Sequence, residues 1–138
     1  MLSLLCCLGA WARRQAAEPF PSEPRVSLAA RAAAYDAQGH IALTARLRTP
    51  PGGGKEVDEG LRLVVENRNP EAYRYVSGRM TFYGADGVRC GGAAFALDEL
   101  AMGEEAEVQA EGLRLTCHSV EWRVVATSLL TWAGETAR

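Results

Sequence analysis

Residues 61–87 read LRLVVENRNPEAYRYVSGRMTFYGADG, and this stretch decides the fold. Apolar side chains recur there at every second position on both sides of a polar turn. They are Leu61, Leu63 and Val65 before the turn, and Val76, Met80 and Phe82 after it. This period of two predicts half-buried β-strands. The turn at Asn67-Arg68-Asn69-Pro70 suits a chain reversal, because Asn tolerates left-handed backbone angles and Pro donates no ladder hydrogen bond. We therefore expect strand, turn, strand, and a second turn at residues 84–87.

The same alternation continues through most of the chain. We expect further strands within residues 25–35, 41–47, 88–97, 105–110, 113–118 and 120–126, with a hairpin turn at residues 36–39. Residues 49–60 are expected to form a loop, residues 98–103 a loop or a single helical turn, and residues 129–138 a tail. Trp122 is the best candidate for a central core aromatic, because one such ring buries roughly 150–250 Å². The prediction is an all-β, antiparallel, two-sheet immunoglobulin-like sandwich of about seven strands over residues 25–128.

Composition limits the class of partner. The chain has 138 residues, 48% of them hydrophobic and 23% charged, which are ordinary values for one globular domain. Its net charge of −2 argues against nucleic acid as a partner, because non-specific binding to nucleic acid needs a basic domain. Lys55 is the only lysine among the 15 basic residues. This arginine excess indicates either a bias in coding composition or bidentate recognition of anions.

The first twelve residues, MLSLLCCLGAWA, are apolar and uncharged. They are too few to cross a bilayer as a helix, which needs about 20 residues. They resemble the apolar core of a secretory signal with a small-x-small cleavage site at residues 10–12, although no basic residue precedes them. The alternative is a retained arm that contacts a membrane or a partner. Residues 13–24 are expected to form an extended tether, and the domain is expected to be periplasmic or extracellular, possibly membrane-tethered.

The cysteines fit an exported chain. Cleavage after Ala12 would remove Cys6 and Cys7 and leave Cys90 and Cys117 as a pair. In an oxidising compartment the pair could close a loop of about 27 residues, which the chain-entropy model values at roughly 3 kcal/mol. The alternative is two separate buried thiols that behave as small hydrophobic side chains.

A family resemblance covers about half of the chain, residues 60–126. The segments GLRLVVENRNPEAY, VSGRMTFYGADGVR and LDELAMGEEAEVQA resemble the FxLYD-type and related immunoglobulin-like domains of bacterial envelope proteins. The chain departs from that pattern by its cysteine pair and its N-terminal hairpin. Members of such families are mostly non-enzymatic modules of secreted or membrane-tethered proteins. The resemblance therefore implies binding or assembly in the cell envelope.

Catalytic and metal-binding patterns are weak. His40 and His118 are the only histidines, and neither has the spacing of a zinc site or of a nucleophile–base pair. GGGK at residues 52–55 lacks the spacing of a phosphate-binding loop. We expect no enzyme activity, no catalytic residue, no metal and no cofactor.

One stretch has the residue types that protein interfaces favour. Arg68, Tyr73, Arg74, Tyr75 and Arg79 are the candidate partner-binding residues. An acidic segment follows at residues 98–111, so the two regions could present opposite potentials to a partner. We expect a non-catalytic, exported binding or assembly module with a protein partner in the envelope. The alternative is a small-molecule or metal carrier with a pocket between the sheets, near Trp122 and Met80.

Overall fold

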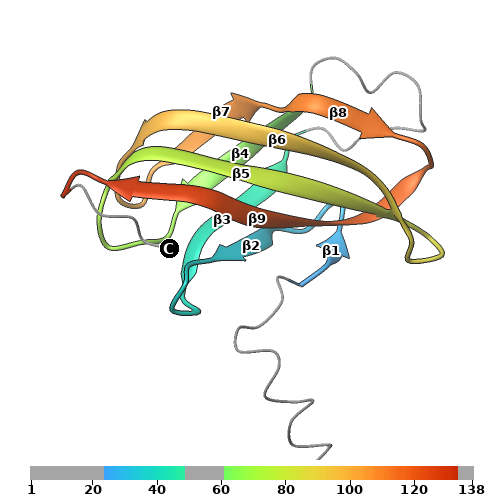
Figure 1. Cartoon of the computed structure of the whole chain (residues 1–138), viewed down its shortest axis with the longest axis horizontal. Helices are drawn as coiled ribbons and strands as arrows, with labels where there is room; N and C mark the ends of the chain where they lie inside the picture. The colour runs from blue at the N-terminus through green and yellow to red at the C-terminus, as the bar shows by residue number, and fades with distance from the viewer. Residues whose placement is uncertain (1–23, 49–60, 134–138) are drawn as a thin grey trace, which may run out of the picture.

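The computed structural model describes residues 24–48 and 61–133, and within them the chain forms two antiparallel sheets and no helix (Figure 1). The predicted all-β, two-sheet sandwich is confirmed. The described residues form nine strands, against the seven or so expected. They are β1 (Val26–Ser27), β2 (Ala32–Tyr35), β3 (Ile41–Leu47), β4 (Arg62–Asn67), β5 (Tyr73–Gly84), β6 (Arg89–Leu100), β7 (Glu105–Gln109), β8 (Glu111–Leu115) and β9 (Ser119–Thr131). The apolar segment 1–12, nearly all of the tether 13–24 and the loop 49–60 lie outside the described residues.

The two layers differ in size. One sheet has five strands in the order β1-β9-β5-β6-β8, and the other has four in the order β2-β3-β4-β7. Strands β3 and β4 follow each other in the chain and pair in the same sheet. If β1 and β2 are counted as the two parts of one first strand, β3 and β4 are the second and third strands. In the constant-type immunoglobulin order, the second and third strands lie in different sheets. The protein is therefore immunoglobulin-like in its two layers and has its own strand order.

The chain changes sheet at both sides of the sandwich. The predicted strand at residues 25–35 is two strands, because the chain turns after Ser27 and crosses from the five-stranded to the four-stranded sheet. The indole Nε1 of Trp122 donates a hydrogen bond to the carbonyl of Ala30 within this crossing, at 3.3 Å. On the other side, Ala110 alone separates β7 from β8, which belong to different sheets. Such bends are how sandwiches turn their corners.

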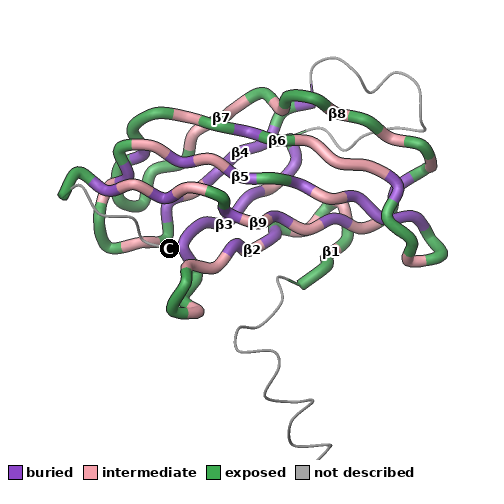
Figure 2. The backbone as a smooth tube through the Cα atoms, in the orientation of Figure 1, coloured by how far each residue is buried: buried purple, intermediate pink, exposed green. Residues whose placement is uncertain are grey.

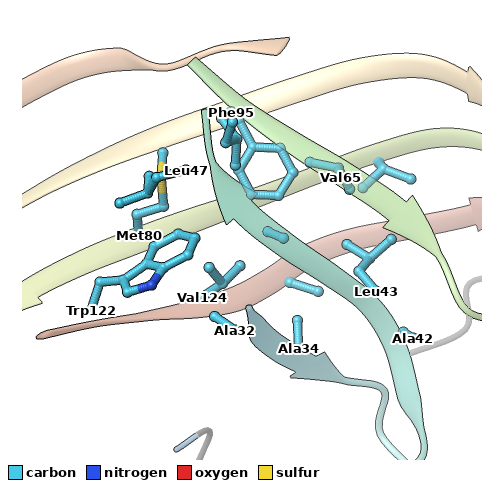
Figure 3. Packing of buried hydrophobic residues seen from close by; sticks show 14 of the residues in the cluster. Ala32, Ala34, Ala42, Leu43, Leu47, Val65, Met80, Phe95, Trp122 and Val124 are labelled. Atoms are coloured by element: carbon cyan, nitrogen blue, oxygen red, sulfur yellow. The ribbon is translucent and has the colours of Figure 1, made fainter. Parts of the chain in front are cut away.

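Buried stretches occur along strands of both sheets (Figure 2), and their apolar side chains form one core cluster. Figure 3 shows Trp122, Met80, Leu47 and Phe95 pointing into this core. Trp122 is fully buried, and its ring stacks with that of Phe82 at a centroid distance of 6.4 Å. Its predicted place at the centre of the core is confirmed. Inward-facing residues of both sheets thus supply the apolar area that stabilises the fold.

Strands β6 and β9 extend further than the sequence predicted. β6 continues to Leu100, so the chain reversal expected from residue 98 begins only after Leu100. β9 continues to Thr131, beyond the expected end of the domain at residue 128. The register between β5 and β9 shifts at Ser77/Gly78, which face Ser128 and Ala126 and leave Thr127 as the additional residue. Such a bulge moves the following side chains to the opposite face, so the alternation that identifies a strand in the sequence is interrupted.

Candidate functional site

The outer face of the five-stranded sheet brings together side chains from three adjacent strands. Arg79 of β5 pairs with Ala94 of β6, and Thr81 pairs with Gly92. On the other side of β6, Gly92 pairs with Arg114 of β8. Because Met80 and Phe82 point into the core, the alternation of β5 directs Arg79 and Thr81 outward.

A groove of about 670 Å³ lies over these strands. Its lining is Arg79, Met80, Thr81, Arg89, Cys90, Gly91, Gly92, Ala93, Ala94, Glu111, Gly112, Arg114 and Thr116. The outward-facing residues of β6 here, Gly92 and Ala94, are small and leave the floor low between the side chains of β5 and β8. We call this feature the arginine groove.

Two glycines shape the floor of the arginine groove. A Cβ atom at Gly91 would overlap the carbonyl oxygen of Arg114, so glycine is required for the close approach of β8. A Cβ atom at Gly92 would lie 3.3 Å from Nη2 of Arg89. The guanidinium of Arg89 therefore lies over Gly92, the residue that pairs with Arg114. Two guanidinium-bearing residues thus meet at one point of the floor, and Arg79 lies two β6 residues further along.

The charges in the arginine groove are uncompensated. Arg79, Arg89 and Arg114 form no ion pair with any residue of the described ranges. Glu111 is the one acidic residue in the lining, so three arginines and one glutamate give the groove a net charge of +2. A guanidinium offers five donors in a planar fork that matches carboxylate and phosphate oxygens. The arrangement can therefore bind an anion.

The basic surface continues beside the groove. Arg123 of β9 pairs with Thr81, and its Nε is buried without a hydrogen-bond partner in the described structure. The guanidiniums of Arg25 and Arg123 lie 3.8 and 5.9 Å from the ring centroid of Tyr83, within cation–π range. Arg25 also donates a hydrogen bond to the carbonyl of Gly87 at 2.9 Å.

The predicted Cys90–Cys117 disulfide is present, with the Cα atoms 5.6 Å apart. Thr116 donates two hydrogen bonds to the carbonyl of Cys90, from its backbone N at 2.8 Å and its Oγ1 at 3.2 Å. These links join the end of β8 to the start of β6. They lie at the point where the chain leaves β8 and passes the turn of the β5–β6 hairpin to reach β9. The disulfide thereby fixes the wall of the arginine groove that holds Arg114.

The structure does not gather the five predicted partner-binding residues into one surface. Arg79 lines the arginine groove, Arg68 lies 4.0 Å from Glu66 on the other sheet, and Arg74 is exposed. Tyr75 is half-buried beside Asp98 and Leu130. Tyr73 is fully buried, and its hydroxyl donates to the carbonyl of Ala42 at a long 3.5 Å.

A role for the Tyr73 ring in a surface contact is therefore wrong. Tyr73 and Arg79 are an even number of residues apart, so in a regular strand both would face outward. The pairing of β5 with β9 shifts between Tyr73 and Tyr75, and Tyr73 therefore points inward. Burial also raises the pKa of the Tyr73 hydroxyl above its usual range. The candidate partner-binding residues did not include Arg89 and Arg114; the alternation of their strands indicates that these side chains face outward, but not that they lie beside Arg79.

The remaining candidate features are a metal-binding cluster, an internal pocket and a membrane-spanning helix. Among the described residues, no group of three or more His, Cys, Asp and Glu side chains could hold a metal ion. Trp122 and Met80, near which the alternative interpretation of the sequence places a pocket between the sheets, are buried members of the core cluster. No helix in the described part of the chain is long and apolar enough to span a membrane. No family model, curated protein or solved structure matches the chain.

Proposed function

We propose that the protein is a non-catalytic, exported binding or assembly module that contacts a protein partner in the cell envelope through the arginine groove. The observation that supports this most directly is the convergence of Arg79, Arg89 and Arg114 without ion-pair partners among the described residues. Unpaired, clustered charges on one face favour a complementary partner surface and accelerate association with it.

Two further observations support export and a binding role. Disulfides persist in secreted and periplasmic proteins and are rare in the cytosol, so the Cys90–Cys117 bond favours an oxidising compartment. The signal-like segment at residues 1–12 and the resemblance to FxLYD-type envelope domains agree with this location. The lining of the groove has no imidazole, and its cysteine is part of the disulfide, which favours binding over nucleophilic catalysis.

Affinity purification from envelope fractions under non-reducing conditions tests this proposal. Ala94→Trp fills the groove floor with a bulky ring whatever the charge of the occupant. Ile41→Trp places the same ring at an exposed position of the four-stranded sheet and is the matched control. We expect the wild type and Ile41→Trp to retain the same stoichiometric partner and Ala94→Trp to lose it. Equal retention by both variants, or no partner for the wild type, contradicts the proposal.

A further inference from the structure

We infer that the arginine groove binds the carboxylates of an acidic polypeptide segment in an extended conformation. This inference rests on the proposed function and names the chemistry of the partner at that site. Three properties of the groove support this inference: its charge, the spacing of its arginines and the shape of its floor.

The charge of the groove calls for about two negative groups. Three arginines and one glutamate leave it at +2, and the arginines have no carboxylate of the described residues within ion-pair distance. Arginine binds carboxylates by two parallel N–H···O bonds, which are stronger than neutral hydrogen bonds. The guanidinium of Arg89 over Gly92, beside Arg114, provides one position for such a group.

The spacing of the arginines matches an extended chain. Arg114 is in register with Gly92 and Arg79 with Ala94, so the two arginines are offset by two residues along β6. Two residues of a strand span about 7 Å, which is also the distance between alternate side chains on one face of an extended peptide. The two arginines also stand on opposite sides of β6, about 10 Å apart across the sheet, so the two carboxylates would meet guanidiniums that lean in from opposite walls. A Glu-x-Glu pattern supplies the matching offset along the groove.

The shape of the floor admits a polypeptide backbone. Gly92 and Ala94 are the outward-facing residues of β6 in the groove; the guanidinium of Arg89 lies over Gly92, and the floor is open at Ala94. The side chains of β5 and β8 stand on either side, with the two strand axes about 10 Å apart by ordinary sheet spacing. This shape is a trough along the strand, which suits an extended chain better than the flat surface of a bilayer.

Fluorescence anisotropy with labelled peptides tests the inference on the full chain with its disulfide intact. The probe is a Ser/Gly peptide with a single Glu-Ser-Glu element. One control peptide has Gln in place of both Glu residues, and a second has the two Glu residues adjacent. We expect saturable, salt-sensitive binding of the Glu-Ser-Glu peptide, and at least about tenfold weaker binding of both controls. Equal binding of the adjacent arrangement overturns the extended geometry.

Variants that each replace one charged side chain by glutamine locate the binding site. Arg89→Gln and Arg114→Gln should each weaken the Glu-Ser-Glu peptide about tenfold. Arg62→Gln makes the same charge change on the four-stranded sheet, where Arg62 pairs with Glu107, and should leave the affinity unchanged. Glu111→Gln should strengthen binding, because it removes the one acid of the lining. Thermal melts and intact masses establish that each variant is folded and oxidised, and uniform affinities among folded variants overturn the assignment.

Two further probes test whether the bound anion is a peptide carboxylate, a free phosphate or a lipid headgroup. Inorganic phosphate and vesicles containing phosphatidylglycerol are titrated against the same variants. Binding of either one that depends on Arg89 and Arg114, without binding of the peptide, overturns the inference in favour of a phosphate ligand. If Ala94→Trp abolishes partner capture while the Glu-Ser-Glu peptide fails to bind the wild type, the inference fails and the proposed function stands.

Discussion

The outer faces of the two sheets have similar arginine side chains and different surroundings. On the four-stranded side, Arg31, Arg48, Arg62 and Arg68 each lie within 4.0 Å of a glutamate carboxylate, supplied by Glu66, Glu105 and Glu107. Half-buried Arg46 has no such partner among the described residues. On the five-stranded side, Arg79, Arg89 and Arg114 have none. The difference is one of pairing, and arginine content alone does not reveal it.

The crossing at Ala110 produces this difference. β7 contains Glu105 and Glu107 and pairs with β4 in the four-stranded sheet, where these acids meet Arg31, Arg48 and Arg62. After one residue the chain enters β8 in the other sheet, with Arg114 facing the arginine groove. Glu105 and Glu107 thus pair with arginines of the four-stranded layer, and Glu111 is the one acidic residue that lines the arginine groove on the other layer.

The largest expected effect comes from breaking the wall of the arginine groove. Replacement of Cys90 and Cys117 together by Ser should lower the free energy of unfolding by about 3 kcal/mol, because the disulfide closes a long loop in the unfolded chain. Denaturant titration measures the loss. Hydrogen exchange should show that β8 loses protection first while β3 and β4 keep theirs. Equal loss of protection in both sheets would mean that the disulfide stabilises the whole sandwich and not this face in particular.

A smaller effect is expected where the two layers are joined. Tyr73→Phe removes the hydroxyl that reaches from β5 to the carbonyl of Ala42 in β3, and should cost about 1 kcal/mol at neutral pH. Burial raises the pKa of Tyr73 in the folded state, so its contribution is complete below the unfolded value of about 10 and is lost as the pH rises above it. Stability between pH 9 and 11 should therefore fall less steeply in the variant. Tyr75→Phe is the control, and an equal flattening in both variants contradicts the assignment to Tyr73.

Sequence reasoning predicted the layers better than the site. Period-two alternation is a property of each strand alone, so β3, β4 and the middle of β5 could be recognised directly. The faces of Tyr73 and Leu129 depend on bulges in the β5–β9 pairing, and a one-residue shift exchanges inside and outside. The neighbours of Arg79 and Arg114 depend on sheet order, which joins segments distant in the chain. Local patterns contain no information about that order, so the arginine groove became visible only in the folded chain.

The smallest expected effect on stability is also the sharpest test of the comparison between faces. Glu107→Gln frees both Arg48 and Arg62 on the four-stranded side, and because these ion pairs are largely exposed it should cost about 0.5 kcal/mol or less. If absence of pairing is what makes an arginine face bind anions, this variant should bind the Glu-Ser-Glu peptide at a second, weaker and salt-sensitive site. Calorimetry would then give a stoichiometry above one, whereas Glu111→Gln should raise affinity at a stoichiometry of one. A stoichiometry of one in both variants would show that free guanidiniums are insufficient, and would point to the low floor at Gly92 and Ala94 as what distinguishes the five-stranded face.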